Sequence, residues 1–129
     1  MKYVYTAVFH SESGKVFARI PDLPGCITSG KDLSDAINEI TDAASGYLVV
    51  AEDEGLDIPS PTPQQKLNRN KGEELSYILV DTIAYRAATD THAVRKNVSL
   101  PAWMFKLAEK RSINCSEVLQ EGLMKRLQA

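Results

Sequence analysis

The stretch from Asp32 to Gly55 constrains this chain most, because its hydrophobic residues recur with the period of an α-helix. Asp32 suits an N-cap, Asp35 adds a carboxylate to the first turn, and Gly55 suits the residue after the last turn. Apolar side chains at helical spacing predict one stripe over about five turns. They are Leu33, Ala36, Ile37, Ile40, Ala43, Ala44, Tyr47, Leu48 and Ala51.

Strand patterns lie on both sides of this predicted helix. Four segments alternate or are rich in β-branched and aromatic residues, namely 2–9, 15–20, 26–29 and 75–85. Turn residues at 11–14 join the first two into a hairpin, whereas 56–74 contains three prolines and predicts an extended connection. Residues 1–85 therefore predict a β-β-β-α-β domain, an α+β fold with one helix packed on a small sheet.

The last part of the chain predicts a separate small module. Residues 86–93 are small and polar and predict a linker. After it, residues 94–129 fit one strand at 94–100, a helix with Pro101 in its first turn, and a second helix that starts with an Asn114-x-x-Glu117 capping box. About 36 residues without a metal or a disulfide cannot bury enough surface alone, so we expect two copies to pair.

These 36 residues resemble a ribbon-helix-helix repressor module, in which two strands pair into a ribbon that enters the major groove of DNA. Alternation places Arg95, Asn97 and Ser99 toward the groove, where they can contact bases. Backbone N–H groups near Asn114, Cys115 and Ser116 are expected to hold a phosphate. The expected dimer core consists of Val98, Leu100, Trp103, Met104, Leu107, Val118, Leu119 and Leu123.

Lys96 departs from this pattern, because it falls at an inward position where an apolar residue is expected. Two interpretations stay open. Either its aliphatic stem runs along the dimer edge and its ammonium group reaches a DNA phosphate, or the ribbon starts at Asn97 and Arg95 leaves the groove.

Charge divides the chain at about the same place as these predicted modules. Residues 1–89 hold 8 Lys/Arg against 13 Asp/Glu, a net charge of −5, while residues 90–129 hold 7 against 4, a net charge of +3. An acidic body suits a basic protein partner, and a basic tail suits a polyanion.

The segment FARIPDLPGCITSGKDLSDAINEITDAASGYL, residues 17–48, resembles the signature of HicB antitoxins, and IPSP at residues 58–61 resembles the segment that follows it in that family. The resemblance implies a partial RNase H-like domain without nuclease activity that binds HicA, a small ribonuclease toxin with a double-stranded-RNA-binding-like fold. Within the signature, Asp22 is interpreted as a local Asx-turn residue rather than a catalytic acid.

Enzymatic and metal-dependent functions find no support in the sequence. Cys26 and Cys115 lack metal-ligand spacing, and no motif places a nucleophile beside either histidine. Only Asp81 is a clear acidic residue on a predicted strand, whereas a two-metal nuclease needs several. We therefore expect no metal, no cofactor and no catalysis, in a cytoplasmic protein that does not bind membranes.

The sequence thus predicts an antitoxin that neutralises a HicA-type mRNA-cleaving toxin and represses its own operon as a homodimer bound to operator DNA. One alternative is a stand-alone ribbon-helix-helix regulator whose N-terminal domain binds a ligand or oligomerises. An RNase H-like nuclease is the other. Whether dimers pair further into tetramers is left open.

Overall fold

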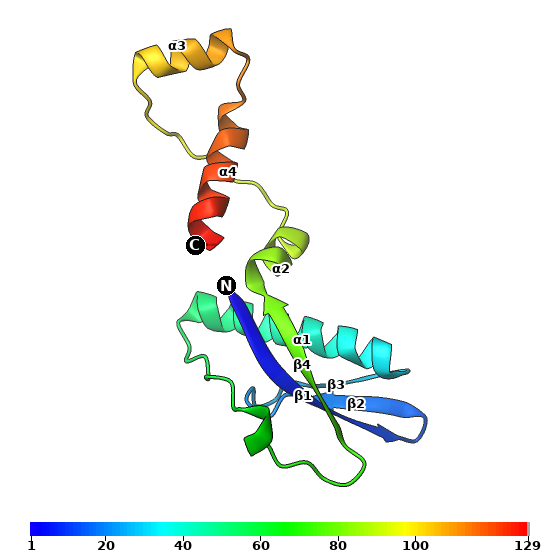
Figure 1. The fold of residues 1–129 in the computed structure, drawn as a ribbon. Helices are drawn as coiled ribbons and strands as arrows, with labels where there is room; N and C mark the ends of the chain where they lie inside the picture. Colours follow the sequence, from blue (N-terminus) through cyan, green and yellow to red (C-terminus); the bar gives the residue numbers. More distant parts are fainter. Residues whose placement is uncertain (129) are drawn as a thin grey trace. The chain divides into compact units, whose positions relative to one another are not determined.

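A computed structural model of the chain describes residues 1–128, which fall into two compact units. The N-terminal unit is Lys2–Thr89, and the C-terminal unit begins at Asp90 (Figure 1). All strands of the described residues belong to the N-terminal unit, together with helices α1 and α2, whereas α3 and α4 belong to the C-terminal unit.

An antiparallel sheet of four strands forms the N-terminal unit, in the order β3-β2-β1-β4. The strands are β1 Lys2–Glu12, β2 Lys15–Arg19, β3 Ile27–Gly30 and β4 Glu74–Asp81. Ser13 and Gly14, with φ of 52° and 78°, form the tight turn between β1 and β2, as a two-residue hairpin requires. The predicted order of three strands, one helix and a fourth strand is confirmed.

Helix α1, Leu33–Glu54, packs on one face of this sheet (Figure 1). The Asp32 carboxylate accepts the Asp35 N–H at 2.8 Å, and the Asp35 carboxylate in turn accepts the Lys31 N–H at 2.8 Å. At the other end Gly55 has φ 67°, and its N–H donates to the Ala51 carbonyl. Both predicted helix ends are confirmed.

The core lies between α1 and the sheet face beneath it. The buried apolar side chains of α1 are Ala36, Ile40, Ala44, Leu48 and Ala51, and those of the strands and the turn after β2 include Tyr5, Ala7, Phe9, Ala18, Ile20, Leu23, Ile78 and Val80. Leu33 and Tyr47, at the edges of the predicted stripe, remain exposed. The opposite sheet face has no covering helix in the N-terminal unit and exposes Val4, Tyr77 and Leu79.

The predicted fourth strand at 75–85 is too long. Strand β4 stops at Asp81, whose carboxylate accepts the Ala84 N–H at 3.1 Å and caps helix α2, Thr82–Thr89. The first compact unit therefore extends to Thr89 rather than ending at residue 85, and the predicted linker at 86–93 begins inside α2. The predicted extended connection at 56–74 also contains one short 3₁₀ helix, η1, Gln64–Lys66.

In the C-terminal unit, helices α3, Ala102–Lys110, and α4, Cys115–Gln128, follow an irregular stretch. Ser112 has φ 54°, and the Ile113 N–H donates to the Ala108 carbonyl at 2.9 Å, which closes α3 with a Schellman-type turn. Pro101 is the N-cap of α3, one position earlier than predicted. The predicted strand at 94–100 is not formed within the single chain, where this segment pairs with no other strand.

Candidate functional site

The turn after β2 and the proline-rich segment after α1 are joined by hydrogen bonds. The Asp22 carboxylate accepts both the N–H and the hydroxyl of Thr62, at 2.8 and 2.6 Å, and the Tyr5 hydroxyl donates to the Pro59 carbonyl. The interpretation of Asp22 as a local Asx-turn residue is wrong, because its carboxylate bonds a residue 40 positions away. Asp22, in the first segment that resembles HicB antitoxins, thus bonds the residue that directly follows the second segment, residues 58–61.

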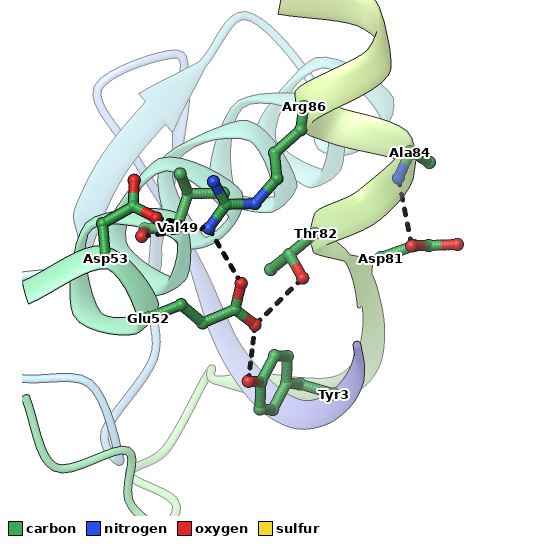
Figure 2. A network of polar contacts seen from close by, with 8 residues as sticks. All are labelled: Tyr3, Val49, Glu52, Asp53, Asp81, Thr82, Ala84 and Arg86. Atoms are coloured by element: carbon green, nitrogen blue, oxygen red, sulfur yellow. Dashed lines mark hydrogen bonds and ion pairs between the residues drawn. The ribbon is translucent and has the colours of Figure 1, made fainter. Parts of the chain in front are cut away.

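A cluster of polar side chains fastens α2 to α1 and β1 (Figure 2). The Glu52 carboxylate accepts hydrogen bonds from the Tyr3 hydroxyl at 2.7 Å, the Thr82 hydroxyl at 3.0 Å and the Arg86 guanidinium at 3.0 Å. Arg86 also pairs with Asp53 at 2.9 Å. Because α2 precedes the C-terminal unit in the chain, this cluster holds the last element of the sheet domain in place.

The contacts within this cluster shift the pKa values of Glu52, Tyr3 and Arg86, and each shift favours the protonation state that the hydrogen bonds require. Burial would raise the pKa of Glu52, but the hydrogen bonds from Tyr3, Arg86 and Thr82 outweigh it, and the pKa lies below its usual range. Burial, followed by the hydrogen bond to Glu52, raises the pKa of Tyr3 to about 12. Hydrogen bonds to Asp53 and Glu52 raise the pKa of Arg86. Glu52 is therefore charged, and Tyr3 neutral, at neutral pH.

The raised pKa of Tyr3 predicts a loss of stability at alkaline pH. A group whose pKa is higher in the folded state stabilises the fold below its unfolded pKa, and that contribution disappears as the pH rises through the folded value. The melting temperature is therefore expected to fall between about pH 10 and pH 12. In Tyr3→Phe this fall should be weaker, while Tyr77→Phe, on the open sheet face, should keep it. An unchanged pH profile in Tyr3→Phe would contradict the role of this hydroxyl.

The residues predicted to contact DNA lie in two exposed parts of the C-terminal unit. Arg95, Lys96, Asn97 and Ser99 belong to the irregular stretch before α3, and in the part of the chain that the structure describes their side chains make no hydrogen bond or ion pair. Asn114, Cys115 and Ser116 stand at the start of α4, also exposed. The structure does not bring the two groups together in one site.

Only half of the predicted capping box at α4 is formed. The Asn114 carboxamide oxygen accepts the Glu117 N–H at 3.2 Å, and the Asn114 carbonyl accepts the Val118 N–H at 3.1 Å. No bond from the Asn114 N–H back to the Glu117 side chain occurs among the described residues. This single cap is enough to define where α4 starts.

Every residue predicted for the dimer core is exposed in the single chain. Trp103 is 62% exposed, and Val98, Leu100, Met104, Leu107, Val118, Leu119 and Leu123 are also classed as exposed. Five further large apolar side chains outside the predicted core share this exposure, namely Val94, Phe105, Ile113, Met124 and Leu127. Apolar side chains gathered without a core of their own are typical of a surface that another chain covers.

Sequence reasoning missed the Glu52–Arg86 cluster. One local signal was available, because Asp81 stands three residues before Ala84, which is the spacing between an N-cap side chain and the backbone N–H that donates to it. Nothing in the pattern could pair Arg86 with Glu52, since 34 residues separate them.

Within the described residues, no group of three or more His, Cys, Asp or Glu side chains is placed to hold a metal ion. Asp81, the acidic residue considered for a nuclease, caps helix α2. None of the helices described is long and apolar enough to cross a membrane.

Comparisons with solved structures agree on the fold. The chain is similar to one from a toxin–antitoxin complex of Streptococcus pneumoniae, with a TM-score of 0.63 and 18% identity over 98% of this chain and 99% of the other. The antitoxin HicB of Burkholderia pseudomallei matches with a TM-score of 0.55 and 21% identity over 97% and 96%. A chain of a HicA3 and HicB3 toxin–antitoxin complex matches with a TM-score of 0.52 and 19% identity over 61% and 99%.

No curated protein matches this sequence. The family model for the HicB-like antitoxin of bacterial toxin–antitoxin systems matches residues 5–121, which include nearly all of the sheet domain, the whole of α3 and the first half of α4. That span is most of the chain, and the mixed fold with a four-stranded antiparallel sheet and four α-helices agrees with the solved HicB structures. The chain therefore belongs to the HicB-like antitoxin family of bacterial toxin–antitoxin systems.

Proposed function

We propose that this antitoxin binds and neutralises a HicA-type, mRNA-cleaving toxin through its N-terminal unit, and that it represses its own operon through a dimeric C-terminal unit bound to operator DNA. The observation that carries the toxin-binding half is family membership over residues 5–121. Similarity to chains of two toxin–antitoxin complexes, one of them of HicA3 and HicB3, supports a toxin as the partner. The family is one of antitoxins and is not a known enzyme family.

Charge supports this division of labour. The net charge of −5 over residues 1–89 favours a basic protein that itself binds RNA, because such a protein presents cationic groups. The net charge of +3 over residues 90–129 favours DNA.

The exposed apolar side chains of α3 and α4 support an obligatory dimer. A module of this size, in which none of the described side chains is buried, gains a core only when a second copy covers it. In the ribbon-helix-helix arrangement that we propose, segments 94–100 of two chains pair antiparallel, and Arg95, Asn97 and Ser99 face the major groove. We further propose that the sheet domain is a partial RNase H-like fold.

The alternative function is a stand-alone transcriptional regulator whose N-terminal unit binds a ligand or oligomerises. The exposed apolar surface of the C-terminal unit is expected for a stand-alone regulator as well as for an antitoxin. Toxin binding is therefore the property that distinguishes the antitoxin from the regulator.

If the proposal is right, a small basic toxin is expected to be encoded beside this chain, and co-expression with it is the test. An antitoxin is expected to restore growth in cells that are arrested by the toxin, and to co-purify with it as a complex that survives size-exclusion chromatography. The control is the toxin expressed with an empty vector, which should arrest growth. Continued arrest with no complex would favour the stand-alone regulator.

A further inference from the structure

A hollow of about 440 Å³ lies beside α1 in the N-terminal unit. Its lining combines the buried Cys26 and Ala51 with apolar side chains that point into solvent, which are Ile27 on β3, Val50 on α1 and Leu56 after α1. These three are 67%, 55% and 58% exposed. Exposed apolar residues gathered around a concavity are typical of an interaction site, whereas scattered ones are not.

The helix stripe that borders this hollow has small or apolar residues at its centre and an acid at each end. Glu39, Ala43, Gly46, Val50 and Glu54 follow one another at intervals of three or four residues, so they lie along one side of α1. Ala43 and Gly46 belong to the lining and leave room beside it. Glu39 and Glu54 are both exposed, and they lie on the same side of α1 as these lining residues, one toward each end of the helix.

All charged side chains in the sequence of α1 and of the segment that follows it, up to Lys66, are acidic. Helix α1 carries six acidic residues and no Lys or Arg, and no Lys or Arg lies between Lys31 and Lys66. Asp57 also lines the hollow. Among the described residues, Glu39, Glu54 and Asp57 form no ion pair.

These charges decide which occupant fits. A second copy of this chain would bring the same carboxylates face to face, and nucleic acids or anionic lipid surfaces would be repelled. A basic protein fits both features: an apolar side chain of that protein would fill the hollow, and the Lys or Arg residues on either side of it would pair with the acidic residues nearby.

We propose that the hollow beside α1, which we call the α1 groove, is the surface on which the basic toxin docks. One apolar side chain of the toxin fills the groove, and its flanking cations face Glu39, Glu54 and Asp57. This assignment rests on the proposed toxin-binding function.

Two matched substitutions test the groove. Val50→Lys places a bulky cation at the groove, and Leu79→Lys makes the same change at a side chain of nearly equal exposure, 57%, on the open sheet face. Affinity of the full chain for the toxin, in a variant without RNase activity, is measured by isothermal titration calorimetry. Val50→Lys is expected to weaken binding about 30-fold or more, as loss of an interface hot spot does, and Leu79→Lys to leave it within about 3-fold.

Charge reversal supplies a second measurement. Glu39→Lys/Glu54→Lys is expected to lower the association rate and flatten its salt dependence, whereas Glu12→Lys/Glu74→Lys, two exposed acids at the hairpin end of the sheet, should change both less. Melting temperatures of all variants verify that each is folded.

The outcomes separate the two hypotheses. If the unsubstituted chain binds the toxin and Val50→Lys binds as tightly, the groove assignment is overturned and toxin binding stands. A change in the oligomeric state of Val50→Lys would instead assign the groove to a second copy of this chain. Absence of binding by the unsubstituted chain would overturn both the function and the groove.

Discussion

Replacing Gly30 with alanine is expected to destabilise the N-terminal unit by about 1–3 kcal/mol or more. Gly30 ends β3 just before the first turn of α1, and a Cβ built there would lie 2.4 Å from the Ala36 backbone nitrogen. The clash is with backbone atoms of a capped helix, so no side chain can rotate away to relieve it. To make room for the Cβ, β3 and α1 would have to move apart at the point where Gly30 contacts the first turn of α1.

Thermal unfolding followed by circular dichroism measures this effect. A loss of this size should lower the melting temperature by at least about 4 °C in a unit of about 90 residues. Gly46→Ala makes the same chemical change at the middle of α1, where the new Cβ would lie an ordinary 3.6 Å from the Tyr85 hydroxyl. Because alanine favours helix, Gly46→Ala should be neutral or stabilising by up to about 1 kcal/mol. Equal melting temperatures for both variants would refute the close approach at Gly30.

Leu119→Asp is expected to break the C-terminal dimer. Leu119 belongs to the apolar side chains of α4 that remain exposed in the single chain, and the proposed dimer buries it. A carboxylate buried there without a partner should cost about 3 kcal/mol or more, or about 100-fold in the dimer Kd. Sedimentation should show half the number of subunits, and operator affinity should be lost with the dimer.

Two controls separate dimerisation from DNA contact. Gln120→Asp introduces the same charge at the next position of α4, a polar side chain outside the predicted core, and should keep the dimer. Arg95→Ala/Asn97→Ala should also keep the dimer, yet weaken operator binding at least about 10-fold and reduce its salt dependence. Operator affinity that survives both Leu119→Asp and Arg95→Ala/Asn97→Ala would refute the proposed ribbon.

Local signals in the sequence were enough for most of the N-terminal unit. The α1 stripe, its Asp32 cap and its Gly55 end could be predicted because each depends on neighbours within one or two turns. The hairpin followed in the same way from alternation and a Ser13-Gly14 turn. Helix α2 was missed because its apolar residues read as a continuation of β4, and the Asp81 cap was not recognised.

The proposed DNA-contacting residues are a different case. Alternation along residues 94–100 assigns sides to Arg95, Asn97 and Ser99 only if a strand forms, and a strand needs hydrogen bonds from another chain. The single chain supplies no such partner, so these residues stay a prediction. The same holds for Lys96, whose two interpretations differ only once the ribbon exists.

The sequence by itself determined where α1 begins and ends, the order of the four strands around it, which side of α1 is buried, and how charge divides the chain. Only the tertiary structure decided that Asp22 bonds Thr62, that Arg86 joins Glu52, and that apolar residues of β3 and α1 line a common groove with Asp57. The physical reason is the separation in sequence between the residues that interact. Caps, turns and periodicity act between residues a few positions apart, whereas these contacts join residues about 30 to 40 positions apart and exist only after α1 has packed on the sheet.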